Sequence, residues 1–359
     1  MLIIDSHLDL SWNAMQWGRD LHLAAYTIRA QENGMTGAGR AQGTVSLPEM
    51  RRGRVALCFA TVLSRCTGIP DPLLDYRSVA QAYAVGQGQI AYYRALEREG
   101  YIRVIADLEA LNQHLAEWEA WEADHPTETT DTPPLGFVIS MESADPIMTP
   151  GQLEEWYRAG LRVIGPAHYG PGRYAGGTGT ENGVSEIGVW LLKEMERLGV
   201  ILDLTHFSDQ AFWQALDHYH GPVLASHNNC RALVPHQRQF SDQQLKAIVE
   251  RDGVIGAVCD VWMLIPDWNA GKSSNKEVSL DTVANHMDYV CQLAGDSRHA
   301  AIGSDLDGGF GREASPHDLD TIADLQKLGE LLAKRGYSGD DIVNLMYGNW
   351  LRLLRRAWS

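Results

Sequence analysis

Short apolar runs recur along the chain, and each is followed by polar residues and then by a longer amphipathic stretch. Each run holds four to nine residues rich in Val, Ile, Leu or Ala. Apolar and polar positions do not alternate clearly within them, which is typical of strands buried on both faces. The runs are Leu2–Asp5, Val55–Leu63, Gly136–Met141, Val163–Ala167, Ile201–Leu204, Pro222–Ser226, Val254–Val258 and Ala301–Ser304.

The stretches between the runs have helical character. The clearest are Asp75–Gly100, Glu186–Leu198, Asp242–Arg251 and Ser279–Ala294. Ser241 stands at the N-cap of the third, with Gln244 in the reciprocal capping position. Eight strands alternating with helices predict an α/β protein with a parallel sheet, and the number eight predicts closure into a (β/α)8 TIM barrel.

Two segments interrupt the alternation. Residues 118–134, with many Asp, Glu, Thr and Pro residues, are expected to form a surface insertion before the third strand. Residues 170–183 contain six glycines and are expected to form a mobile loop after the fourth strand. Since neither an internal repeat nor a domain-splitting linker is recognisable, we expect residues 1–359 to form a single domain.

Composition and charge narrow the possible partners and the cellular compartment. The formal charge of −16 argues against nucleic acid or an anionic membrane as the main partner. The five cysteines include no CxxC pair, which indicates reduced thiols and neither a disulfide framework nor a cysteine zinc site. Residues 1–5 run directly into the first strand, and no apolar run approaches the ~18 residues of a membrane span. These features predict a cytoplasmic protein.

A histidine or a carboxylate follows six of the eight runs. One such residue is weak support for a site, because a single histidine after a strand is more often a hydrogen-bonded structural residue. Six strand ends are different, because a barrel places its catalytic groups on that face, and buried polar groups are costly without partners. The residues are His7, Asp9, Glu142, His168, His206, His227 and Asp305.

These residue types indicate a metal centre. Imidazole and carboxylate without thiolate suit zinc and also admit Mn, Co, Ni or Fe. Such a set holds two ions if one carboxylate bridges them, and water between two ions loses a proton near neutral pH and attacks the substrate. Asp305 is then expected to take that proton and pass it to the leaving amine.

The motifs around these residues resemble those of the membrane (renal) dipeptidase family, peptidase family M19 of the amidohydrolase superfamily. The resemblance extends from residue 3 to the Gly348-Asn349 segment, in the family's order. The motifs that carry it are His7-Leu-Asp9, Glu142, Asp-Leu-Thr-His206, Ala-Ser-His227 and Gly303-Ser-Asp-Leu-Asp-Gly.

The resemblance implies a zinc-dependent dipeptidase with two zinc ions bridged by Glu142. One ion would be bound by His7, Asp9 and Glu142. The other would be bound by Glu142, His206 and His227. His168 matches the histidine that contacts the substrate and polarises its scissile carbonyl. The implied partner is a small dipeptide, and a homodimer is a candidate assembly.

Arg238 matches the family arginine that holds the substrate's terminal carboxylate, a task that suits a guanidinium fork. Arg231 is a rival, because it lies only four residues after His227 and spacing alone does not choose between the two. Asp260 lies in a segment that departs from the mammalian sequences. It either meets a substrate ammonium or caps a turn.

Two other functions remain open at this stage. The first is a related two-metal amidohydrolase acting on N-acyl amino acids or another small amide or ester. The second is a metal-binding protein without turnover. The histidines away from the strand ends are expected to be solvated; they are His114, His125, His236, His286, His299 and His317.

Overall fold

The structure, a computed structural model, describes residues 1–125 and 131–359 of the chain. Each of the eight runs predicted from the sequence forms a strand. A further strand of three residues, β3, was not predicted, because so short a run carries little pattern. The strands are β1 (Ile3–Leu8), β2 (Val55–Leu63), β3 (Ile102–Val104), β4 (Leu135–Glu142), β5 (Leu161–Gly165), β6 (Ile201–Asp203), β7 (Val223–Leu224), β8 (Ile255–Ala257) and β9 (Ala300–Ile302).

All strand pairs are parallel, which confirms the predicted α/β class. A seven-stranded sheet follows the order β1-β2-β4-β5-β6-β7, with β3 beside β4, and β8 and β9 form a separate pair. A single bridge between Ala225 and Ile255 links the sheet to the pair. The named strands therefore form two hydrogen-bonded sets, which we call ladders: the seven-stranded sheet and the β8–β9 pair. The parallel strands of the predicted (β/α)8 barrel are present, but the described residues do not form one continuous ring of paired strands.

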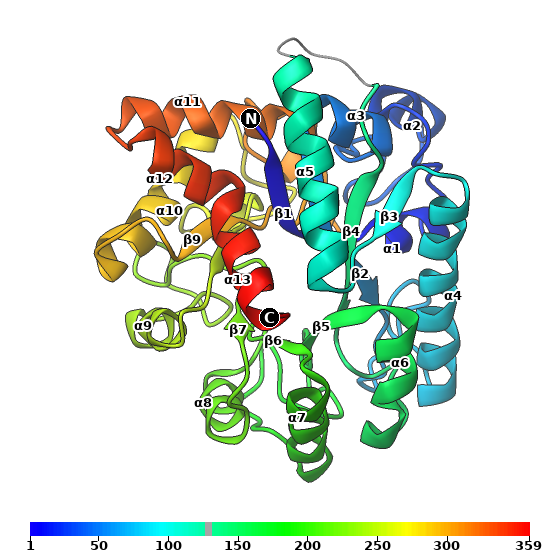
Figure 1. Ribbon diagram of the computed structural model, residues 1–359. Helices are drawn as coiled ribbons and strands as arrows, with labels where there is room; N and C mark the ends of the chain where they lie inside the picture. The colour runs from blue at the N-terminus through cyan, green and yellow to red at the C-terminus, as the bar shows by residue number, and fades with distance from the viewer. Residues whose placement is uncertain (126–130) are drawn as a thin grey trace.

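Helices lie around the outside of the strands, as Figure 1 shows for α4, α6, α7, α8, α9 and α10. All four helices predicted from the sequence are present, and Ser241 and Gln244 form the expected capping box. The helices are α1 (Leu10–Met15), α2 (Ala25–Gln31), α3 (Leu47–Arg52), α4 (Val79–Arg98), α5 (Leu108–Asp124), α6 (Leu153–Ala159), α7 (Glu186–Leu198), α8 (Asp209–His218), α9 (Asp242–Glu250), α10 (Leu280–Ala294), α11 (Lys327–Lys334), α12 (Gly339–Val343) and α13 (Asn349–Ala357).

One buried cluster joins both ladders to the C-terminal helix. It takes a residue from, or directly beside, each strand; the residues are Ile4, Leu57, Ile105, Val138, Val163, Ile201, Leu224, Val254 and Ala301. Trp350 of α13 packs on Phe59 with ring centroids 5.5 Å apart, and its indole N–H donates to the Ile302 carbonyl at 2.8 Å. The strands thus enclose a common apolar layer that α13 covers.

The interior between the two ladders is tightly filled. The Ser6 hydroxyl of β1 donates to the carbonyl of Ser226, beyond β7, and at 3.1 Å to the carbonyl of Ile302 in β9. Gly256 and Gly303 face the same point. A Cβ on Gly303 would lie 1.8 Å from the Ser226 carbonyl oxygen, so the close approach of these strands requires glycine.

The two predicted insertions have different outcomes. Residues 118–124 belong to the end of α5, residues 126–130 lie outside the described residues, and Trp118 donates its indole N–H to the Pro134 carbonyl at 3.0 Å. Residues 170–183 do form a loop between β5 and α7, as predicted, and only part of this loop is exposed. The part from Tyr174 to Thr178 is buried and hydrogen-bonded along its backbone.

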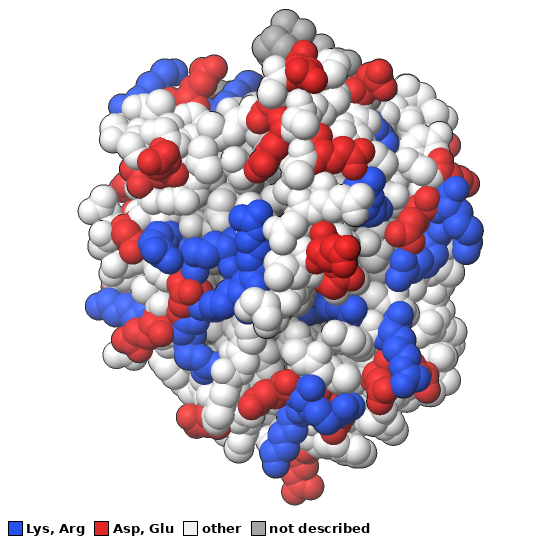
Figure 2. All heavy atoms as spheres, in the orientation of Figure 1, with Lys and Arg blue, Asp and Glu red and all other residues white. Residues whose placement is uncertain are grey.

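Acidic and basic side chains lie close together on the face drawn in Figure 2. Arg352 and Arg356 of α13, for example, both pair with Asp252. Among the described residues, no helix is both long and apolar enough to cross a membrane. All five cysteines are free thiols.

Three histidines that were expected to be solvated are instead buried, and each ring is hydrogen-bonded to a backbone carbonyl; they are His114, His286 and His299.

The glycine contact between the ladders gives a test of the fold. We expect Gly303→Ala to lower the free energy of unfolding by at least ~1–3 kcal/mol, because the added methyl group meets a backbone oxygen that cannot move aside alone. Urea unfolding curves measure the change. Gly329→Ala in α11 is the matched control, because its methyl group would meet only Ile342 at an ordinary 3.8 Å. Equal stability of Gly303→Ala and the parent protein would contradict this account of the packing.

Candidate functional site

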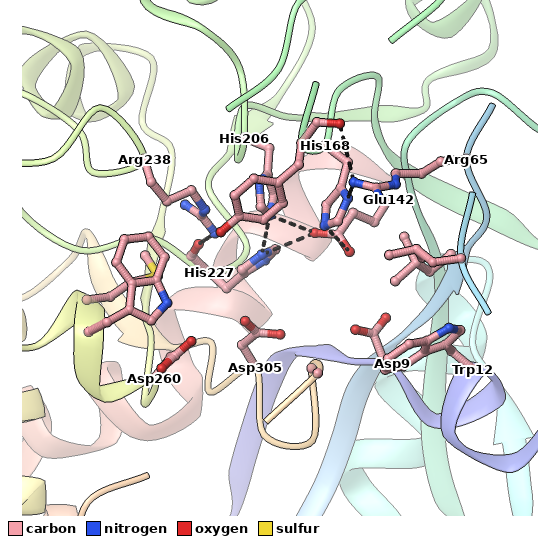
Figure 3. A pocket seen from close by; sticks show the side chains of 17 residues that line it. Asp9, Trp12, Arg65, Glu142, His168, His206, His227, Arg238, Asp260 and Asp305 are labelled. Atoms are coloured by element: carbon pink, nitrogen blue, oxygen red, sulfur yellow. Dashed lines mark hydrogen bonds and ion pairs between the residues drawn. The ribbon is translucent and has the colours of Figure 1, made fainter. Parts of the chain in front are cut away.

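The polar residues singled out from the sequence gather where the strands end. His7 is in β1 and Asp9 directly follows it, while Glu142 is the last residue of β4. His168, His206, His227 and Asp305 follow β5, β6, β7 and β9. Because carboxyl ends of parallel strands meet at one edge, these side chains lie together: six of the seven line one pocket (Figure 3), and His7 is buried beside it, with Nε2 3.7–3.8 Å from Asp9, Glu142 and Asp305. The pocket has a volume of about 320 Å³.

Glu142 lies at the centre of this group. Its Oε1 atom is 3.0 Å from His206 Nε2 and 3.2 Å from His227 Nε2. Its Oε2 atom is 3.7 Å from His7 Nε2 and 3.6 Å from His168 Nε2. The two carboxylate oxygens therefore face two different sets of imidazoles, the arrangement that a bridging ligand requires.

The donor atoms fit two metal ions. Glu142, His206 and His227 form one group with ligand atoms within 4.8 Å of one another, and His7, Asp9 and Glu142 form another. These are the two sets that the sequence resemblance implies. His7 Nε2, Asp9 Oδ1 and Glu142 Oε1 are buried and have no hydrogen-bond partner among the described residues. Buried polar atoms are costly without partners, so these orphaned atoms fit metal ligation.

The outer nitrogens of three imidazoles contact hydroxyl groups. Thr178 Oγ1 is 3.0 Å from His206 Nδ1, and Ser226 Oγ is 2.8 Å from His227 Nδ1. Thr61 Oγ1 is 3.5 Å from His7 Nδ1. A hydroxyl can accept the Nδ1 proton, which leaves the lone pair of Nε2 directed at Glu142. Such outer contacts commonly orient the histidines that bind metals.

Electrostatics favour a cation at the centre. Burial lowers the pKa of His206 and of His227 well below the usual value, which keeps both rings neutral and able to bind a metal. Burial raises the pKa of Asp305 well above its usual value, and the nearby Asp9 and Glu142 raise it further although His7 lowers it. Carboxylates crowded in a dry pocket gain stability when positive charge is added.

Asp305 is held in a strained loop that glycine makes possible. Its φ is +57°, in the left-handed region, and its Oδ1 atom is 3.8 Å from His7 Nε2. A Cβ on Gly308 would lie 2.0 Å from that same Oδ1 atom. Asp307 supports the loop by accepting the backbone N–H of Thr44 at 2.7 Å.

The glycine-rich loop, residues 170–183, contacts both His168 and His206. Thr178 donates its backbone N–H to the His168 carbonyl at 2.9 Å, while its hydroxyl contacts His206. Gly177 passes so close that a Cβ there would lie 1.7 Å from the His168 carbonyl oxygen. The loop thus sets the relative position of residues after β5 and β6.

Arg238 and Arg231 have different surroundings. Arg231 is partly exposed and bidentately paired with Asp209, at 2.9 and 2.7 Å. Arg238 is buried and lines the pocket, with N–H groups donated to Asn228 Oδ1 and the His227 carbonyl, each at 2.9 Å. No carboxylate among the described residues pairs with it, and its Nε atom has no partner. A buried cation without a counter-ion favours Arg238 as the anion site.

Asp260 lies between the metal pocket and a second cavity of about 780 Å³. Its Oδ1 atom has no hydrogen-bond partner among the described residues, and loss of surrounding water raises its pKa to about 7. Trp262 lines both cavities, and Trp268 lines the second. Asp260 directly precedes a short helical turn, the position of a cap, yet its side chain makes no cap hydrogen bond. The other role expected from the sequence, contact with a substrate ammonium, stays a prediction.

Arg65 also lines the pocket, and it was not among the residues predicted from the sequence. It follows β2, in a loop without a recognisable motif, and its guanidinium NH1 lies 2.9 Å from His168 Nδ1. The two residues are 103 positions apart, so only the folded chain brings them together.

Comparisons with known proteins point in one direction. A family model described as membrane dipeptidase (peptidase family M19) matches residues 1–358. A Klebsiella pneumoniae protein, described as an uncharacterized protein in the pqqA 5' region, is 32% identical over 63% of this chain and 83% of its own length. Dipeptidase aclJ of Aspergillus oryzae is 32% identical over 56% of this chain and 46% of its own length.

A solved structure shares the fold. The metallopeptidase from Rhodobacter sphaeroides, liganded with a phosphinate mimic of the dipeptide L-Ala-D-Ala, superposes with a TM-score of 0.77 and 23% identity. The superposition covers 100% of this chain and 99% of that chain. The arrangement of strands and helices described above is therefore a known one.

The glycine-rich loop generates a prediction about the site. Gly177→Ala should lower metal-dependent hydrolysis by on the order of a hundredfold, because displacing the loop moves His168 and His206 and misplacement by ~1 Å has effects of that size. Activity and circular dichroism are measured together, so that unfolding is recognised. Gly151→Ala, whose methyl group would only approach Trp190 at 3.9 Å, should behave like the parent protein. Full activity in Gly177→Ala would disprove the role of the loop.

Proposed function

This chain belongs to the membrane dipeptidase family, peptidase family M19, and from that premise we propose that it hydrolyses the peptide bond of small dipeptides with two zinc ions bridged by Glu142. The observation that carries the proposal is the position of Glu142. One of its oxygens faces His206 and His227, and the other faces His7. A single buried carboxylate placed in this way suits two ions rather than one.

The ligands follow from the two groups of donor atoms. His7, Asp9 and Glu142 would hold one ion, and Glu142, His206 and His227 would hold the other. When bound, such a pair of ions supplies an activated water as nucleophile and a Lewis acid for the scissile carbonyl. Imidazole and carboxylate ligands without thiolate support zinc as the metal.

The protein's own residues would then position the substrate and move its protons. Arg238 would hold the terminal carboxylate, because it is a buried guanidinium with donors to spare. His168, whose Nε2 atom faces the metal centre, would donate to the carbonyl oxygen as that oxygen gains charge. Asp305 would accept the proton of the attacking water and deliver it to the leaving amine. Asp260 would contact a positively charged group of the substrate.

A second function is favoured by one observation. The cavity beyond Asp260 is larger than the metal pocket and is lined by Trp262, Trp268 and Phe310. It would accept a bulky group that a small dipeptide does not possess, as in an N-acyl amino acid. A screen of L-Xaa-L-Xaa, L-Xaa-D-Xaa and N-acyl amino acid libraries with zinc-loaded protein separates the two functions.

We further propose that the two ladders are parts of one (β/α)8 barrel. The bridge between Ala225 and Ile255 supports this, as do the Ser6 hydrogen bonds that cross from β1 to β9 and to the residue beyond β7.

The bridging role of Glu142 makes a prediction about metal content. Glu142→Ala removes a ligand from both proposed sites, so bound zinc should fall below one equivalent per chain and turnover should be lost. Elemental analysis after gel filtration measures the metal. Asp307→Asn is a suitable comparison, because it alters a nearby buried acid outside both ligand groups and should retain most of the metal. Near-normal zinc in Glu142→Ala would rule out bridging.

The carboxylate site is tested through Arg238. Arg238→Ala should raise KM for dipeptides by one to two orders of magnitude, because a hydrogen bond to a charged group contributes ~1.5–3 kcal/mol and each ~1.4 kcal/mol is tenfold. Arg238→Lys should recover part of the loss, since it restores the charge without the fork.

A dipeptide amide is the control, because it lacks the terminal carboxylate. It should be a poor substrate for the parent protein and hardly worse for Arg238→Ala. Equal slowing of dipeptide and amide would show that Arg238 is structural, and the proposed substrate contact would fail.

A further inference from the structure

The four imidazoles around Glu142 differ in what their outer nitrogens contact. His7, His206 and His227 each have a hydroxyl oxygen beside Nδ1. A hydroxyl donates or accepts, so it permits a proton on Nδ1 and a lone pair on Nε2, the form that binds a metal. His168 alone has a guanidinium there, with Arg65 NH1 at 2.9 Å from Nδ1.

A guanidinium has only donors to offer, so this contact decides the protonation of the ring. For Arg65 to donate, His168 Nδ1 must carry a lone pair and no proton. The neutral ring then carries its single proton on Nε2. That nitrogen faces the metal centre, 3.6 Å from Glu142 Oε2, so the ring presents a donor where its three neighbours present lone pairs.

Arg65 is itself held in place on its far side. Its Nε atom forms an ion pair with Asp75 Oδ2 at 3.4 Å, without a hydrogen bond. Asp75 is buried and is held by the backbone N–H of Thr67, which donates to its Oδ1 atom at 2.9 Å. The guanidinium also donates to the Tyr169 carbonyl at 3.3 Å, and Tyr169 directly follows His168 in the chain. Asp75, Arg65 and His168 thus form a continuous row that ends at the metal centre.

We propose that Arg65 is a positioning residue that fixes His168 as the Nε2–H tautomer, and so makes it a hydrogen-bond donor to the substrate carbonyl instead of a third ligand to a metal ion. The proposal rests on the proposed function for the identity of the acceptor, but the tautomer itself follows from the contacts of Arg65 alone. The positive charge of Arg65 also strengthens the Nε2–H group as a donor to an oxygen that gains negative charge.

The tautomer is measured without any substrate. In the zinc-loaded protein labelled with 15N-histidine, the His168 signals are identified by their absence in His168→Ala. We expect Nδ1 to appear as an unprotonated nitrogen and Nε2 as a protonated one. A protonated Nδ1 in the wild-type protein would overturn the proposal. Since this reading needs no turnover, it stands even if no dipeptide is hydrolysed and the proposed function fails.

Kinetics test whether Arg65 acts through His168. Arg65→Met should lower kcat for dipeptides on the order of ten- to a hundredfold with KM and zinc content nearly unchanged, the size expected for one charged hydrogen bond. Arg65→Lys, which keeps a cationic donor, should recover part of the rate. In a His168→Ala background, Arg65→Met should have almost no further effect, because the group it positions is gone.

Two results would contradict this role. A rise in KM without a fall in kcat, or effects of Arg65→Met and His168→Ala that multiply, would show that Arg65 contacts the substrate directly. Arg251→Met is the matched control, because it removes a partly buried arginine outside the pocket whose guanidinium donates to the backbone carbonyls of Tyr219 and Gly221. It should leave both kcat and the His168 signals unchanged.

Discussion

The structure around the pocket depends on one buried carboxylate, that of Glu142, placed at the end of β4 between four imidazole rings. A carboxylate in such surroundings is costly unless positive charge accompanies it. Burial raises the pKa of Glu142 to about 8, and Asp9 adds to that effect while His7 opposes it. Arg238 and Arg65 line the same pocket, and burial lowers the pKa of His206 and His227. Metal ions bound at the proposed sites would add positive charge directly at the Glu142 carboxylate.

Much of the remaining architecture serves to hold those side chains at short distances. Backbone strain appears at His206 and Asp305, both with positive φ, and strained positions of this kind persist only where the surrounding structure determines them. Glycine at positions 177 and 308 leaves room where any side chain would strike the functional residues. Hydroxyl groups and one guanidinium complete the outer contacts of the rings. His7, His206 and His227, the imidazoles proposed to bind metal, contact hydroxyl groups, whereas His168 contacts a donor-only guanidinium.

The strands and the strand-end residues could be predicted because both signals are local. An apolar run followed by His or Asp is readable in a few residues, and so is the capping box of Ser241 and Gln244. Features that depend on distant parts of the chain could not be predicted. Arg65 has no motif, and the pairing of Arg231 with Asp209, which supports the preference for Arg238 stated from the sequence, joins residues 22 positions apart. His114 likewise reads as a surface residue until the fold places it against Ala56.

The apolar layer beneath the site has a consequence for folding. It combines residues from β1, near the start of the chain, with Trp350 and its neighbours in α13, near the end. Contacts between such distant segments form late, because a long loop must close before they contribute. The layer cannot be complete until the final helix has docked, and the strands whose ends carry the ligands pass through that layer. Assembly of the strand-end geometry at the pocket is therefore expected to be one of the last events of folding.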